Sequence, residues 1–538
     1  MARAAAQGAI EGAAMGGPAA DADWARRALI ALAALTAARL VFLASGVAPV
    51  HFDEAQYWTY GETLDWGYYS KPPLSAWIIR LFTDVLGDTA FGLRAASPLI
   101  HAWIAWLIFA SARRLFDARV GFWSALLYLT LPGVAVSSAL MTTDPPMMLG
   151  WAGALYALTR AGAFGSAAGA AGESAPAGAA APGAAARIGW WALAGAAVGA
   201  GLLGKYTMIA FVGGLLGFAL FGARRAPFAG GAVGGAAGPL AALLAGLAVF
   251  GPNIAWNAAN DFAAFSHVVD NAKLGGSGPA VNLGKGFGFM IAQAGVFGPI
   301  ALAALGAALA LALSGRWAVD RRHLALFWLA APLPILMTLQ AFMSRAHPNW
   351  AAPAYVAGAI LVALWLLGRP RGALWLGLSA AIGIGVSLGF WALTAVYDAY
   401  GRDLPRLYDP FKRSRLENAV CARALPHLEG RLLYSNDRRI VASCLLQIPA
   451  PMERARIAPR IPPKNHYQLA IPLDSGDPRE MVLAMRFAPE TAEGFARRFE
   501  SWRLIEEGEI RTHGDRADPY SLYLVRGARA AADEAPAR

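Results

Sequence analysis

Two adjacent carboxylates, Asp53 and Glu54, begin a polar and aromatic segment in an otherwise apolar chain. Acids in the first turn of a helix interact favourably with the helix dipole, so a purely structural role is one interpretation. A carboxylate can also act as a general base or orient a polar substrate. Adjacent helical side chains point in different directions. We therefore expect only one of the pair to face a reaction, and we assign that role to Asp53.

Three positively charged residues are candidates for binding a phosphate group. Lys71 precedes two prolines in "YYSKPPL", and the stiff extended backbone there would hold its ammonium group for a phosphate. An ordinary interfacial lysine is the alternative. Lys205 stands alone among apolar residues in "GLLGKYT". Arg345 lies in "SRAHPNW", and a guanidinium group can bind a phosphate through two hydrogen bonds.

Asp144 precedes two prolines in "TTDPPM", where it either caps the next helix or supplies a second catalytic carboxylate. We predict that a further set of polar and aromatic side chains binds substrate. Its members are Glu54, Tyr57, Tyr69, His267 and His347.

The elements that position these residues are predominantly apolar. The chain has 538 residues, of which 57% are hydrophobic and 15% charged, whereas a soluble domain carries about 25% charged residues. Apolar runs of about 18 residues or more recur, each long enough to cross a bilayer. We predict a polytopic α-helical membrane protein with about eleven transmembrane helices. The predicted spans are 28–47, 92–111, 119–139, 145–162, 188–204, 206–222, 233–252, 287–313, 323–342, 350–367 and 373–396.

The net charge of +11 comes from small clusters between the apolar runs rather than from one basic tract, which argues against nucleic-acid binding. Arginines gather in alternate connections, and this pattern predicts a cytoplasmic N-terminus. The candidate residues then fall on the external face, where ionisable groups beside the membrane usually mark function. Arg39 lies inside the first predicted span, and we expect it to pair with an acid or a carbonyl group.

This orientation divides the chain into three predicted regions. Residues 1–27 form a cytoplasmic tail, 28–396 form the membrane domain with a first external loop at 48–91, and 397–538 form an external domain. In the last region, strand-like runs ("RLLYSND", "HYQLAIPL", "MVLAMRF", "SLYLVRG") and a helix-like run ("TAEGFARRFESW") predict a small α/β domain. Its two cysteines, Cys421 and Cys444, either form a disulfide in an oxidising compartment or remain free buried thiols.

The motifs "FDEAQYW", "YYSKPPL", "TTDPPM" and "GLLGKYT", in this order, resemble the membrane glycosyltransferases of the GT-C class. The pattern is similar to that of bacterial ArnT-like aminoarabinose transferases and of protein O-mannosyltransferases, the family 39-like enzymes, over about residues 28–365. "HPNWAAPAY" also looks like a motif of the bacterial family 39-like members. The resemblance implies a GT-C fold with amphipathic helices in the first external loop. It also implies a location in a bacterial inner membrane, with the C-terminal domain in the periplasm.

The resemblance carries residue roles with it. Asp53 matches the essential aspartate of the family's first loop, and Lys71 matches the "KPP" lysine that is associated with the carrier phosphate. Asp144 and Lys205 match further cavity residues. ArnT-like proteins commonly have glutamate before the "KPP" lysine, whereas this chain has Ser70. A metal site is therefore in doubt. We expect no required metal or cofactor, and His267 is the one candidate ligand if a divalent metal does bind.

The resemblance implies transfer of a hexose or pentose from a polyprenyl-phosphate donor, with inversion at the anomeric carbon. Lys71, Lys205 and Arg345 would bind the donor phosphate and offset its growing charge. Asp53, with Asp144 as a second catalytic carboxylate, would take a proton from the acceptor or orient it. Lipid A or another envelope glycolipid is the expected acceptor, and a protein is the alternative. A lipid-linked-sugar flippase would instead show internal repeats and charges at mid-depth, and a scaffold would leave the carboxylates unexplained.

Overall fold

The computed structural model describes residues 18–165, 183–222, 236–272, 281–400, 411–448, 450–513 and 516–529. The chain divides into two compact units. The first, called the helical unit, takes in the described parts of Met1–Val41, Ser97–Ala139 and Thr143–Leu388. The second, called the sheet unit, takes in those of Phe42–Ala96, Leu140–Thr142 and Gly389–Arg538. The sheet unit thus combines the first loop with the C-terminal region.

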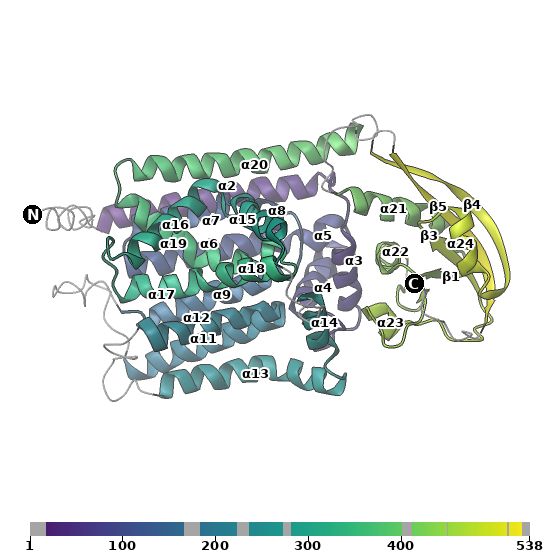
Figure 1. Ribbon diagram of the computed structural model, residues 1–538, viewed down its shortest axis with the longest axis horizontal. Coiled ribbons are helices and arrows are strands. Elements are labelled where there is room, and N and C mark those ends of the chain that lie inside the picture. Colours follow the sequence, from purple (N-terminus) through teal and green to yellow (C-terminus); the bar gives the residue numbers. More distant parts are fainter. Residues whose placement is uncertain are drawn as a thin grey trace, which may run out of the picture. The chain divides into compact units, whose positions relative to one another are not determined.

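The helical unit is a bundle built around one large apolar core. Helix α19 (Tyr355–Leu367) is almost entirely buried and packs against α7, α16 and α17. Helices α9, α11 and α13 lie side by side (Figure 1). The remaining bounds are α2 (Pro18–Ala44), α6 (Ala96–Leu115), α7 (Ala118–Thr130), α8 (Pro132–Ser137), α9 (Asp144–Arg160), α11 (Ala184–Gly204), η1 (Tyr206–Met208), α12 (Ile209–Gly217), η2 (Phe218–Gly222), α13 (Ala237–Ala259), α14 (Ala263–Ala272), α15 (Leu283–Phe297), α16 (Pro299–Leu313), α17 (Arg321–Ala330), α18 (Pro332–Met343), η3 (Pro348–Ala354) and α20 (Gly372–Tyr400).

The chain is a multi-pass helical membrane protein. Within the described residues, seven helical segments are long and apolar enough to cross a bilayer, and a bent pair makes an eighth if it crosses as one span. The remaining three of the eleven predicted spans are helical but shorter or interrupted. They correspond to α7 with α8, to α9, and to the apolar stretch Tyr206–Phe221.

The prediction of one straight span over 287–313 is wrong. Helices α15 and α16 meet there at an angle of 111°. Gly298 lies between them with φ of 86°, a conformation that glycine adopts at little cost, and Pro299 then begins α16. The apolar composition runs unbroken through this bend, so composition alone did not reveal it.

The first helix, α2, begins at Pro18, ten residues before the predicted start of the first span. Residues 1–17 of the predicted N-terminal tail lie outside the described residues. Further along α2, the buried guanidinium group of Arg39 donates a hydrogen bond to the carbonyl of Leu129. This contact confirms that Arg39 pairs inside the bundle.

The arginine-rich connections meet at one end of the helical unit. Arg322 donates to the carbonyl of Leu115 (2.6 Å), and Arg321 donates to the carbonyl of Ala163 (3.2 Å). Helix α9 ends nearby at Arg160 and begins at Asp144. Because a 17-residue helix is about 25 Å long, Asp144 lies at the opposite end of the bundle.

The sheet unit contains a five-stranded mixed sheet of order β2-β1-β3-β5-β4. Strand β1 is parallel to both β2 and β3, whereas β5 is antiparallel to both β3 and β4. The bounds are β1 (Leu432–Ser435), β2 (Ala455–Ile457), β3 (Glu480–Met485), β4 (Phe499–His513), β5 (Arg516–Ala528), α3 (Phe52–Gly61), α4 (Leu74–Leu86), α5 (Ala90–Arg94), α21 (Lys412–Ala424), η4 (Leu425–His427), α22 (Arg438–Leu445), α23 (His466–Ala470) and α24 (Pro489–Ala496).

Alternate residues of β3 enter two separate cores. Val482 and Ala484 join the core that also contains α21 and α22, whereas Met481 and Leu483 join the core that contains α24. The predicted small α/β domain is therefore present. Cys421 of α21 and Cys444 of α22 form a disulfide, as one of the two alternatives expected.

Two local predictions in this domain are wrong. "HYQLAIPL" was expected to form a strand, but its first five residues form α23, because the side chain of Asn465 caps the helix by accepting from the backbone N–H of Gln468. "TAEGFARRFESW" was expected to be one helix, but α24 ends at Ala496, and β4 begins at Phe499.

Candidate active site

A carboxylate, an ammonium group and an amide meet at one end of the helical unit. Oδ1 of Asp144 accepts a hydrogen bond from Nζ of Lys205 at 2.7 Å, and Oδ2 accepts from Nδ2 of Asn349 at 2.8 Å. The side chains of Asp144 and Lys205 are only 12% and 15% exposed. Two of the predicted site residues are therefore in direct contact, and Asn349 joins them.

Local backbone structure explains the position of each group. Asp144 is the first residue of α9, and the two prolines that follow suit the first turn of a helix. Lys205 has an extended backbone (φ −161°, ψ 133°) in the break between α11 and η1. Asn349 lies in η3. Asp144 thus joins three separate segments, which goes beyond the expected alternative of a simple helix cap.

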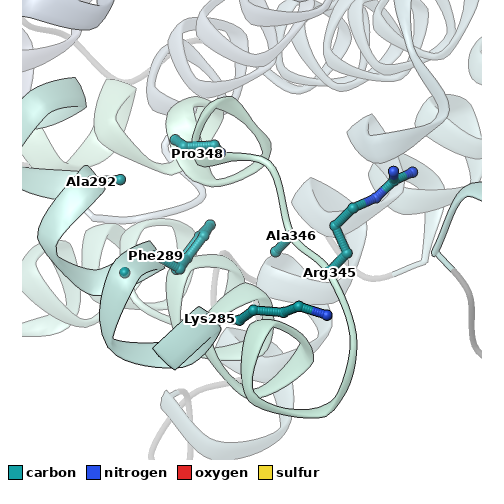
Figure 2. Close-up of a pocket in the computed structure, with 7 residues that line it drawn as sticks. Lys285, Phe289, Ala292, Arg345, Ala346 and Pro348 are labelled. Carbon is teal, nitrogen blue, oxygen red and sulfur yellow. The ribbon is translucent and has the colours of Figure 1, made fainter. Parts of the chain in front are cut away.

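Arg345 follows α18 and lines a pocket of about 200 Å³ together with residues of α15 (Figure 2). The pocket also includes Lys285, which the sequence had not drawn attention to. His347 is exposed two residues beyond Arg345, with its ring 5.2 Å from that of Trp350. His267 lies on α14 and is half-buried.

In the sheet unit, Glu54 is completely buried and forms a two-pronged ion pair with Arg94. Nε and Nη2 of Arg94 donate to the two carboxylate oxygens at 2.9 and 2.6 Å. The same carboxylate accepts from the backbone N–H groups of His51 and Met141. The assignment of Glu54 to substrate binding remains a prediction. In this structure, its oxygens join the start of α3 to Arg94 and Met141.

Asp53 has the opposite environment from its neighbour. Its side chain is 36% exposed, and Oδ1 lies 3.4 Å from Nη1 of Arg438. The same nitrogen donates to Oε1 of Gln56 at 2.5 Å, and the guanidinium group lies over the ring of Phe52 at 5.1 Å. Arg438 begins α22 of the C-terminal region. Burial lowers the pKa of its guanidinium group, but the charge of Asp53, together with nearby tyrosines, raises that pKa overall.

The "KPP" segment is fixed by backbone and aromatic contacts. Tyr68 and Lys71 exchange two backbone hydrogen bonds at 3.0 and 3.2 Å, and the hydroxyl of Tyr69 donates to the carbonyl of Pro463 at 2.6 Å. The ring of Tyr68 stacks on Tyr60. Lys71 is half-buried.

Burial shifts the pKa values of the aromatic side chains that pack beside the "KPP" segment. Tyr57, which was predicted to bind substrate, is only 5% exposed. Burial raises the pKa of Tyr60 to about 12. Burial also lowers the pKa of His466, whose ring packs edge-on against Tyr60, to about 4. This cluster is thus neutral near pH 7 and serves as packing for the "KPP" segment.

Comparison with known proteins identifies the fold and shows which proteins are similar in sequence. A family model described as dolichyl-phosphate-mannose-protein mannosyltransferase matches residues 70–171. Lipid A galacturonosyltransferase RgtD of Rhizobium johnstonii is 35% identical over 347 residues, which are 64% of this chain and 66% of RgtD. Crystal structures of ArnT from Cupriavidus metallidurans, in the apo state and bound to undecaprenyl phosphate, both superpose with a TM-score of 0.62. The chain therefore has the fold of ArnT, and over 347 residues its sequence is similar to that of RgtD.

The two kinds of match differ in extent. The ArnT structures cover 92% and 95% of this chain, and 97% and 99% of ArnT, at 16% and 14% identity. An undecaprenyl phosphate-alpha-4-amino-4-deoxy-L-arabinose arabinosyl transferase of Pseudomonas fluorescens is 35% identical over 83 residues, 15% of each chain. The sequence alignments therefore span less than two thirds of the length of RgtD and of the Pseudomonas protein.

The expectation that this GT-C protein needs no metal remains a prediction. Within the described ranges, no group of three or more His, Cys, Asp or Glu side chains is arranged to hold a metal ion. Ser70, which stands where ArnT-like proteins commonly have glutamate, lies 3.4 Å from the hydroxyl of Tyr60.

Three residues of the candidate site were not predicted from the sequence. Asn349 was overlooked although it lies within the quoted "HPNW" stretch. Arg438 and Lys285 are single cations without a motif, and only the fold brings them to Asp53 and Arg345 respectively. A basic residue that follows an N-capping aspartate, as Arg438 follows Asp437, was the one local signal available.

Proposed function

We propose that this chain transfers a sugar from a polyprenyl-phosphate carrier to lipid A. Three findings support the proposal. The similar protein from Rhizobium johnstonii is named a lipid A galacturonosyltransferase, and an ArnT structure of the same fold was solved with undecaprenyl phosphate. The third and decisive observation is geometric: Asp53 presents a partly exposed carboxylate that Arg438 holds in place. Galacturonic acid is the first candidate sugar.

The reaction would be a direct displacement at the anomeric carbon. The bond from that carbon to the carrier phosphate oxygen breaks as the acceptor oxygen forms the new glycosidic bond, with inversion. Asp53 accepts the proton if the acceptor is a hydroxyl group. If the acceptor is a phosphate of lipid A, no proton has to move, and Asp53 orients the acceptor instead.

The cations would act on the leaving phosphate. Lys71, Lys205 and Arg345 are assigned to it because fixed positive groups stabilise negative charge that grows in the transition state. Lys205 is pre-positioned by its 2.7 Å contact with Asp144 and keeps further N–H groups for a phosphate. Asp144 is therefore assigned to holding Lys205, alongside its earlier assignment as a second catalytic carboxylate.

The proposed location is a bacterial inner membrane, with the reaction on its periplasmic face. The arginine-rich connections gather at one end of the helical unit, and the positive-inside rule assigns that end to the cytoplasm. The Cys421–Cys444 disulfide suits an oxidising periplasm for the C-terminal region. The N-terminus would then be cytoplasmic.

A protein acceptor is the second candidate. The family model that matches residues 70–171 is described as a protein mannosyltransferase, so this part of the chain is similar to enzymes with that acceptor. The same donor class and the same residues would serve both reactions.

Mass spectrometry of lipid A tests the proposal. Cells that carry the gene should show lipid A species heavier by one sugar, and cells without it should lack them. Cells that express Asp53→Asn at a matched level should resemble the deletion. An unchanged lipid A profile, with a sugar lost from envelope proteins, would replace the proposal with the protein acceptor.

A further inference from the structure

The pocket beside Arg345 is lined by both apolar and positively charged residues. Phe289 and Ala292 of α15 and Pro348 of η3 supply apolar surface, and Lys285 and Arg345 supply the charge (Figure 2). The described residues that line the pocket include two cations and no carboxylate. A small group with an apolar ring face and a negative charge fits such a lining.

The two cations come from segments that are firmly joined. The backbone N–H of Asn282 donates to the carbonyl of Phe342 at 2.7 Å, and the side chain of Asn282 caps α15 by accepting from the N–H of Lys285. Gly286 lies against the ring of Phe342 so closely that a Cβ atom there would be 2.1 Å from it. The first turn of α15 therefore has a fixed place against the end of α18.

The opposite side of the pocket is fixed as well. The carbonyl of Arg345 accepts from Nε2 of Gln340 at 3.1 Å, and the carbonyl of Pro348 accepts from Nε2 of Gln293 at 3.2 Å. The next residue, Asn349, binds Asp144. The pocket thus adjoins the carboxylate and ammonium group of the candidate active site.

Lys285 has a free positive charge at this position. Its side chain is exposed, and within the part of the chain that the structure describes, its ammonium group makes no hydrogen bond or ion pair. Figure 2 shows the Lys285 side chain below the loop that carries Arg345, whereas the Arg345 side chain extends from the other side of that loop. A donor with a neutral sugar carries only the phosphate charge, for which Arg345 is already assigned. A second cation here implies a second negative group.

We propose that Lys285 recognises the carboxylate of an acidic donor sugar, a uronic acid, and thereby sets the sugar specificity of the enzyme. The assignment rests on the proposed transfer from a polyprenyl-phosphate donor. The ammonium group donates a charge-assisted hydrogen bond to the carboxylate. The same charge repels an amino sugar, which is protonated near neutral pH.

The test compares three polyprenyl-phosphate donors that carry galacturonic acid, galactose or 4-amino-4-deoxy-arabinose. Full-length protein in detergent is assayed with lipid A as the acceptor. Lys285→Gln should lower the ratio of kcat/KM for the uronate donor to that for the galactose donor about tenfold. Lys285→Arg should restore most of this ratio. Lys285→Glu should lower it further and favour the amino sugar.

Arg316→Gln is the matched control, because it removes one exposed positive charge outside the pocket and should leave the ratio unchanged. Equal losses with all three donors would assign Lys285 to the carrier phosphate and overturn its specificity role. An unchanged ratio would also overturn it. If the wild-type protein transfers none of the sugars, the proposed function fails instead. Calorimetric binding of the same donors then still tests whether Lys285→Glu reverses their order of affinity.

Discussion

Nζ of Lys205 lies 2.7 Å from Oδ1 of Asp144, although the two residues are 61 positions apart. The contact joins the break after α11 to the first residue of α9. Both side chains are largely buried, so each charge depends on the other for compensation.

Replacing Lys205 with glutamine should leave the Asp144 carboxylate without its cation. We expect a loss of roughly 3 kcal/mol of stability and of most of the activity. The double variant Asp144→Asn, Lys205→Gln should be more stable than Lys205→Gln alone, because no buried charge remains uncompensated. Apparent melting temperatures in detergent test this order. A double variant that melts below the single one would contradict the pairing.

The adjacent acids of the first loop should respond differently to neutral substitution. Asp53→Asn should lower kcat by about 10²–10⁴-fold in a protein that still folds, because Asp53 is partly exposed and a general base contributes that much. Glu54→Gln should instead destabilise the protein by roughly 3 kcal/mol, because it breaks the buried pair with Arg94. Turnover and melting temperature, measured on both variants, separate the two effects. Near-normal turnover by folded Asp53→Asn would exclude the base.

Arg438 should act through Asp53. Arg438→Met should reduce kcat more than it changes KM, because the carboxylate loses its 3.4 Å contact and its fixed orientation. Arg438→Lys should recover part of kcat. In the Asp53→Asn background, Arg438→Met should have little further effect on kcat, since coupled residues are not additive. Independent, multiplying effects in this double-mutant cycle would remove Arg438 from the mechanism.

The buried carboxyl group of Glu417 should make stability depend on pH. Burial raises its pKa from 4.5 to about 7, although Arg439 and Arg486 lie 3.4 and 3.6 Å away and Arg413 also favours the charged form. Asp437 opposes them, and its own pKa is lowered mainly through its bonds to Arg439, against the effect of burial. Folded protein therefore holds an extra proton between about pH 4.5 and 7, and the free energy of unfolding falls as the pH rises through that range.

Glu417→Gln cannot ionise and provides the comparison. Relative to this variant, the wild type should lose roughly 3 kcal/mol between pH 4.5 and 7.5. Melting temperatures of both full-length proteins, measured at pH 5, 6, 7 and 8, should therefore diverge. Parallel curves would show that Glu417 titrates at its ordinary pKa when folded.

The helices of this protein were predictable because apolar runs of sufficient length leave few alternatives in a bilayer. The bend at Gly298 was missed because the apolar run continues through it, although the Gly298–Pro299 pair is a turn signal that the sequence contains. In the C-terminal region, "HYQLAIPL" has strand-like composition, yet the capping side chain of Asn465 starts a helix there. The cap provided by Asn465 favoured a helix over the strand that the composition of the eight residues had predicted.

The sequence indicated which residues belong to the candidate site, but it did not indicate most of the contacts between them. Asp144 and Lys205 stood out because isolated charges among apolar residues are rare, and they proved to be partners. The sequence favoured Asp53 over Glu54 without a physical reason, and only the fold shows that Arg94 encloses Glu54 and leaves Asp53 partly exposed. Asn349, Arg438 and Lys285 depend on contacts between segments that are distant in the chain.

The sheet unit combines Phe42–Ala96 with Gly389–Arg538, and this has a consequence for biosynthesis. A ribosome makes the first of these segments early and the second last. Asp53 therefore lacks Arg438 until translation has passed residue 438 and the C-terminal region has folded against the first loop. Chains that terminate or are cleaved before Arg438 lack that partner, so they cannot reach the arrangement on which turnover is proposed to depend.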